Sequence, residues 1–151
     1  MGREILFRGK RVDNGEWVEG LLWKKKYHSN KIFISYFPDE DDYEEVVAVS
    51  PETVGQYTGL KDKNGRKIFE GDVLAYQHFR DDKVVGKVVW GEYNQSKCDE
   101  YCCNHYGWHI DNVERDYYDD TGVGIINMKH VSLEVIGNAF DNPELLGGEH
   151  E

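Results

Sequence analysis

The chain has 151 residues, of which 39% are hydrophobic and 13% aromatic, and its formal net charge is −11. This length fits one domain, and aromatic side chains are large enough to fill its core. The negative net charge argues against general nucleic-acid binding, because Lys and Arg supply most of the affinity for phosphate.

The sequence also indicates the compartment. No apolar run approaches the roughly 20 residues that span a bilayer, and the N-terminus has no signal-peptide core. The three cysteines are an odd number and lie close together, unlike the disulfide framework of a small secreted protein. We therefore expect a cytoplasmic protein that does not contact a membrane.

Short strands dominate the first half of the chain. Asn14-Gly15 is a turn signal, and the proline and acidic residues of 38–42 interrupt the strand pattern. The segments between these signals are rich in aromatic and β-branched residues. The expected strands are Glu4–Arg8, Trp17–Trp23, Lys31–Phe37, Glu45–Ser50 and Thr53–Thr58.

Strands also dominate the second half. The expected strands are Lys67–Phe69, Asp72–Phe79, Val84–Trp90, Gly107–Val113 and Ser132–Phe140. Turn signals about every 8–12 residues predict a mainly β fold, with antiparallel strands in a compact barrel or sandwich core. We expect a single domain over 1–146 and a disordered tail over 147–151.

Helix signals are few. The segment Tyr93–Asn104 predicts one or two irregular helical turns. The segment Asn142–Leu146 predicts a short C-terminal helix, with Asn142 as the N-cap and Pro143 at the first helical position.

Two blocks of sequence resemble the YopX family of phage and prophage proteins. The first block, Gln56–Asp72, reads QYTGLKDKNGRKIFEGD, and the second, Glu134–Leu146, reads EVIGNAFDNPELL. The start, Arg3–Arg8, is similar to the family's Arg-x-Ile-x-Phe-Arg opening, but Gly9-Lys10 stands where Trp-Asp is usual. The resemblance implies a mainly β protein encoded by a phage or prophage. It brings no catalytic residue with it.

The first block contains residues suited to turns. In Asp62-Lys63-Asn64-Gly65, Asn64 and Gly65 predict a type I turn with Gly65 at positive φ. Gly59 and Gly71 mark bends or close backbone approaches, and Asp72 can accept backbone N–H bonds. A Gly-Asp step into a strand and hairpin is also found in small SH3-like barrels, which is an analogy of fold alone.

The same block carries the candidate binding residues. Four basic side chains surround the turn and could contact phosphate or an acidic partner, although a solvated hairpin tip is the favoured explanation. These residues are Lys61, Lys63, Arg66 and Lys67.

A cluster of cysteines and histidines has the character of a metal site. Thiolates and imidazoles are zinc ligands, and four of them complete a tetrahedron. The candidate ligands are Cys98, Cys102, His105 and His109, with Cys103 beside them. The alternative is a set of incidental thiols and imidazoles, because the spacing differs from the usual paired Cys-x2-Cys arrangement.

No catalytic motif accompanies these features, so the sequence favours a noncatalytic accessory protein without a cofactor. Such a protein would bind a macromolecule or assemble with itself, and its expected partners are a second copy or a host or phage protein. Two alternatives stay open. One is a nucleic-acid-binding protein, since residues 1–31 hold eight basic and four acidic side chains, a net of +4, or a DNA-mimic protein acting on host machinery, since the remaining residues have a net charge of −15. The other is a zinc- or thiol-dependent enzyme using Cys98–His109.

Overall fold

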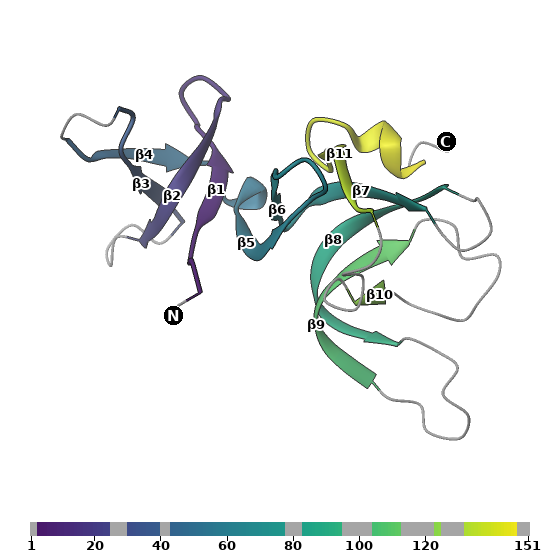
Figure 1. Cartoon of the computed structure of the whole chain (residues 1–151). Coiled ribbons are helices and arrows are strands. Elements are labelled where there is room, and N and C mark those ends of the chain that lie inside the picture. The colour runs from purple at the N-terminus through teal and green to yellow at the C-terminus, as the bar shows by residue number, and fades with distance from the viewer. Residues whose placement is uncertain are drawn as a thin grey trace. The chain divides into compact units, whose positions relative to one another are not determined.

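The computed structural model describes residues 3–24, 30–39, 43–77, 83–94, 104–112, 123–124 and 132–147. It is mainly β, with antiparallel strands in two sheets, as the sequence predicts (Figure 1). The chain forms two compact units, Met1–Gly59 and Leu60–Glu151, and the expectation of a single domain over 1–146 stays a prediction. Residues 148–151 of the expected tail lie outside the described residues.

The first unit is built from one curled antiparallel sheet. Its strands are β1 (Phe7–Lys10), β2 (Trp17–Lys24), β3 (Ile32–Tyr36), β4 (Glu45–Val49) and β5 (Gly55–Lys61), with a 3-10 turn, η1, at Pro51–Thr53. They lie in a six-stranded order, β4-β3-β2-β1-β5-β6, whose last strand, β6 (Lys67–Phe69), belongs to the second unit. Alternate side chains point to one face, where Val18, Ile34, Val47 and Val49 form the buried core.

Two contacts bring parts of this sheet close together, one between β2 and β3 and one between β4 and the residues that follow β1. A Cβ atom at Gly20 would collide with the carbonyl oxygen of Ser35 on β3, so only glycine fits there. Beyond β1, Arg11 forms a bridge with Val49, and the Val12 N–H donates to the Ala48 carbonyl at 3.0 Å. The sheet thus curls back toward β1, but the described residues form no continuous ladder that closes a barrel.

The second unit contains the five-stranded sheet. Its elements are β6 (Lys67–Phe69), β7 (Asp72–Gln77), β8 (Lys83–Asn94), β9 (Asn104–Asn112), β10 (Val123–Gly124), β11 (Glu134–Asn138) and the 3-10 turn η3 (Pro143–Leu146). The sheet order is β10-β9-β8-β7-β11. Its core includes Ile68, Leu74, Tyr76, Val88, Ile110, Leu133 and Val135.

One sequence-based prediction of helix is wrong where the structure describes it, and the predicted C-terminal helix is matched only by a short 3-10 turn. In place of the predicted helical turns, Tyr93 is a buried residue of β8 and Asn104 is the first residue of β9. Residues 95–103 lie outside the described residues. The C-terminal segment forms a single 3-10 turn, because four residues are too few to repay helix nucleation and Gly147 ends the turn at φ +63°. Asn142 does not cap it; its Oδ1 accepts the Asn138 N–H at 3.3 Å.

The structure also bears on membrane insertion. Within the described residues, none of the helical segments has the length and apolar character required to traverse a bilayer.

Candidate functional site

The turn of the first block is organised by Asp62. Its Oδ1 accepts the backbone N–H groups of Asn64 and Arg66, both at 2.9 Å, and its Oδ2 accepts the Val135 N–H at 3.0 Å. Burial raises the pKa of the Asp62 carboxyl, but these donors outweigh burial and hold the pKa below its usual value of 3.8. Asp62 therefore acts as a buried anionic anchor for the turn.

Glycines complete the turn geometry. The Gly65 N–H donates to the Asp62 carbonyl at 3.0 Å, and Gly65 has φ +80°, as a type I turn followed by a left-handed residue requires. Gly59 and Gly71 also have positive φ, +88° and +86°. After Gly71, the buried Asp72 accepts the Phe69 N–H on Oδ2 at 2.8 Å. These residues shape the backbone.

The four basic candidates are spread along this same hairpin. The Nζ of Lys63 lies 3.3 Å from Oε2 of Glu134 in an exposed ion pair, and the Arg66 backbone N–H is bound by Asp62. Lys61 ends β5 and Lys67 begins β6. The four residues thus lie on either side of one turn. Their contact with phosphate or an acidic partner stays a prediction.

The cysteine and histidine candidates are only partly described. Cys98, Cys102 and Cys103 lie outside the described residues, and His105 lies in β9 opposite Tyr93. The buried His109 ring stacks on Tyr93 with centroids 4.7 Å apart, and its Nδ1 is 3.1 Å from the Gly107 carbonyl oxygen. The described residues contain no group of three or more metal-ligating side chains, and the zinc site stays a prediction.

A surface that the sequence analysis missed is the exposed side of β2, β3 and β4, here called the outer face. Cross-strand pairing places its side chains in two rows. The aromatic row is Trp23, Phe33 and Ala48, and the aliphatic row is Leu21, Ser35 and Val46. The opposite face of the same strands carries Ile34 and Val47, which are buried in the core.

The outer face exposes large apolar side chains. Leu21 is 60% exposed, Trp23 46% and Val46 44%. Trp23 and Phe33 meet edge to face with centroids 5.6 Å apart, which fixes their orientation. The Ser35 hydroxyl is hydrogen bonded to the Glu44 carboxylate. Single exposed apolar residues are ordinary, but a contiguous exposed patch marks an interaction surface.

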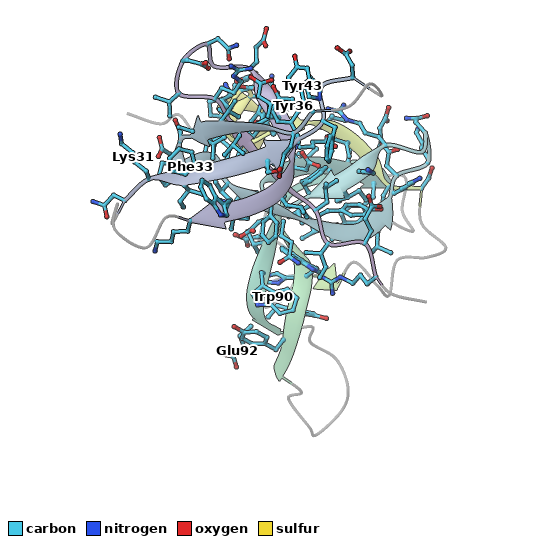
Figure 2. All side chains as sticks on the ribbon, turned by 90° about the vertical axis from the view of Figure 1, so that its left-hand side faces the viewer. Lys31, Phe33, Tyr36, Tyr43, Trp90 and Glu92 are labelled. Atoms are coloured by element: carbon cyan, nitrogen blue, oxygen red, sulfur yellow. The ribbon has the colours of Figure 1, made fainter. Side chains whose placement is uncertain are left out.

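Charged residues also stand at the ends of these strands. Lys31 immediately precedes β3, and Figure 2 shows it beside Phe33. Lys24 pairs with Ile32, which packs on the core side, so Lys24 lies on the opposite face of β2 from Trp23. At the other end, Glu44 immediately precedes β4, which begins opposite Tyr36. Glu19 lies toward this same end of β2, because β2 and β3 are antiparallel.

A second exposed aromatic cluster lies on the β8–β9 pair, where Figure 2 labels Trp90. Trp90 contacts Tyr106 and Trp108 edge to face, with centroids 5.6 and 4.9 Å apart. Tyr106 is 72% exposed, whereas Trp108 packs against the core of the second unit. This cluster is narrower than the outer face, because only two strands carry it.

One signal in the sequence points to the outer face. Leu21, Leu22 and Trp23 are consecutive apolar residues, and a strand buried on one face alone would alternate with polar residues. The run therefore indicates a strand that is apolar on both faces. The partners of these residues on β3 and β4 depend on strand register, which the sequence of one strand does not contain.

Comparison with known proteins shows the family and the fold that the chain shares. The profile of the family described as YopX protein matches residues 6–147. The crystal structure of protein EF1440 from Enterococcus faecalis is similar, with a TM-score of 0.50 and 22% identity, over 96% of this chain and 99% of that chain. At this identity the likeness concerns the fold alone. No curated protein matches the chain. Because the family profile covers nearly all of its length, the chain belongs to the YopX family.

Proposed function

We propose that the protein is a noncatalytic binding module that docks a protein partner on the outer face. The observation that carries this proposal is the contiguous exposure of Leu21, Trp23 and Val46 on three neighbouring strands. Burying such side chains against a partner is favourable by about 25 cal/mol per Å² of apolar surface. Trp23 is the expected centre of the interface, because tryptophan is enriched among residues that dominate binding energy.

The chemistry of the face supports binding rather than catalysis. Five of its six side chains are hydrocarbon or aromatic, and the hydroxyl of Ser35 is engaged by Glu44. Such a surface removes apolar area from water but offers no activated nucleophile and no positioned acid and base for a reaction. The resemblance to phage and prophage proteins supports an accessory role of this kind.

The test removes the apolar character of the outer face without adding charge. Leu21→Ser with Val46→Ser should preserve the fold, because both side chains are exposed, and should abolish binding. Tyr106→Ser is the matched control, since Tyr106 is more exposed and lies on another sheet. Light scattering reports self-association, affinity capture from a bacterial lysate reports other partners, and circular dichroism confirms folding.

We expect the wild type and Tyr106→Ser to associate with a partner, and the double variant to lose that association. A wild type that is monomeric and captures nothing would overturn the proposed function. If the double variant binds as well as the wild type, the binding surface lies elsewhere than on the outer face.

A further inference from the structure

We propose that the aromatic cluster on β8 and β9 binds a small organic cation of the quaternary ammonium class. The cluster consists of Trp90, Tyr106 and Trp108, and Glu92 is the acidic residue paired with it. These strands belong to the second unit, whereas the outer face belongs to the first. The inference therefore adds a second binding site to the proposed function.

Strand register places these residues on one face of the β8–β9 pair. Trp90 lies opposite Trp108, and Glu92 lies opposite Tyr106, two residues farther along β8. Residues two apart in a strand point to the same side, and directly opposite residues have Cβ atoms about 5 Å apart. The exposed Glu92 side chain is therefore a neighbour of the Tyr106 ring, and Figure 2 shows Trp90 and Glu92 in succession on β8.

The rings of Trp90 and Tyr106 form two walls of a corner. Their planes are 84° apart and their centroids lie 5.6 Å apart, so a group in the corner faces the π surface of both rings. Trp108 contacts Trp90 at 67° and packs against the core of the second unit, which holds the Trp90 wall in place. Trp90 is 50% exposed and Tyr106 72%, so a ligand reaches both walls from solvent.

The electrostatics of the corner select a cation. The face of an aromatic ring carries negative potential, and it attracts a cation within about 6 Å of the ring centroid. Glu92 adds a full negative charge. Among the described residues of β8 and β9, it is the only charged residue at a position on this face. The net charge of −11 on the whole chain favours a cation further.

The supply of hydrogen-bond acceptors narrows the class of cation. A lysine ammonium has three N–H donors and an arginine guanidinium five, and each donor that leaves water needs an acceptor. Within the described part of this face, Glu92 offers the only carboxylate. A quaternary ammonium group has no N–H donor, and its methyl groups pack against aromatic rings. Glu92 would repel a neighbouring phosphate, so the ligand is a free compound and not a phospholipid headgroup.

The experiment titrates the intact protein with choline chloride at constant ionic strength. The matched control ligand is the neutral alcohol in which carbon replaces the nitrogen of choline, because it has the same shape without the charge. Heteronuclear NMR separates the indole N–H signals. We expect choline to shift the signals of Trp90 and Trp108 with a millimolar dissociation constant and to leave those of Trp17 and Trp23 in place, since these two lie in the first unit. The neutral alcohol should shift none of them.

Three variants test the walls and the charge. Glu92→Gln removes the charge at nearly constant size, and Tyr106→Ser removes one wall. Each should raise the dissociation constant for choline about two- to fivefold, and so should Trp90→Leu, which keeps an apolar side chain without a ring. Glu92 and Tyr106 are exposed, so their variants should fold, as circular dichroism would verify. Asp111→Asn is the matched control and should bind like the wild type, because Asp111 pairs with Lys87 on the other face of β8 and β9.

Three results would overturn the cation site: no indole shift with choline, the same shifts with the neutral alcohol, or equal affinity in the wild type, Glu92→Gln and Tyr106→Ser. Tighter binding to phosphatidylcholine vesicles than to free choline, measured by co-sedimentation, would overturn the assignment to a free compound. The Leu21→Ser, Val46→Ser variant should bind choline like the wild type. The failure of the cation site therefore leaves the proposed function of the outer face standing, and the reverse holds as well.

Discussion

Asp62 joins residues that are far apart in the chain. Its Oδ2 accepts the Val135 N–H across 73 positions, and its Oδ1 holds the turn that leads into β6. One side chain thus ties the first sequence block to the second. Both blocks that carry the family resemblance meet at this carboxylate, which accounts for the acidic residue in the turn by structure alone.

Asp62→Asn should destabilise the protein by about 3 kcal/mol. An asparagine amide presents one acceptor and one donor, so at least one of the three backbone N–H groups would face another donor. Urea unfolding measures the loss. Glu134→Gln is the control, because Glu134 forms only an exposed ion pair with Lys63 and should change stability by less than about 1 kcal/mol.

The loss of stability caused by Asp62→Asn should depend on pH. The pKa of folded Asp62 is depressed, so its stabilisation is complete above the ordinary value of 3.8 and is lost as pH falls through the lower folded-state pKa. The difference in unfolding free energy between wild type and Asp62→Asn should therefore be constant near neutral pH and narrow below pH 3.8. A difference that narrowed only above neutral pH would contradict this assignment.

The turn around Asp62 is only partly predictable from the sequence. The Asn64-Gly65 pattern specifies its turn locally, and Gly65 has the positive φ that this turn needs. The bond from Val135 to Asp62 depends on the tertiary fold, so no local pattern contains it. For that reason the sequence singled out the neighbouring cations and passed over the carboxylate between them.

Among the strands, β2 and β3 depend on one close approach. The absence of a side chain at Gly20 lets the carbonyl of Ser35 come so near that an added Cβ would lie 2.0 Å from its oxygen. Gly20→Ala should therefore destabilise the protein by about 3 kcal/mol or more, because backbone on β3 has to move. Thermal and urea unfolding monitored by circular dichroism would measure this.

Gly107→Ala is the matched glycine control. Gly107 also lies in a strand, but an added Cβ meets nothing within 4 Å and its φ is not in the left-handed region. We expect a change of less than about 0.5 kcal/mol there. Equal destabilisation by the two substitutions would show that strand glycine as such, and not the contact with Ser35, determines the effect.

Strand positions were predictable because aromatic and β-branched residues alternate between turn signals. β6 is predicted to the residue, and β2 differs only by one residue at its end. The end of β8 and the start of β9 were not predictable, since Tyr93 and Asn104 flank a polar, charged sequence typical of helix or loop. Pairing of the two strands, from Trp90 opposite Trp108 outward, overrides that local preference.

At the scale of the whole molecule, net charge and the apolar outer face act differently on association. The net charge of −11 repels copies of the chain from one another. Moderate salt reduces this repulsion, because it screens exposed charges. The apolar rows do not depend on salt in this way, so binding through them should persist when the charges are screened.

If the protein that docks on the outer face is a second copy, dimerisation should be visible in the thermal stability of the intact protein. A dimer that unfolds to separate chains is stabilised by mass action, and a tenfold rise in concentration should raise the Tm by about 2 °C. The Leu21→Ser, Val46→Ser variant should have a Tm independent of concentration, because it has no dimer to dissociate. Tyr106→Ser should behave like the wild type. Differential scanning fluorimetry across two decades of concentration measures all three proteins, and a wild-type Tm that does not change with concentration would mean that folding stability gains nothing from self-association through the outer face.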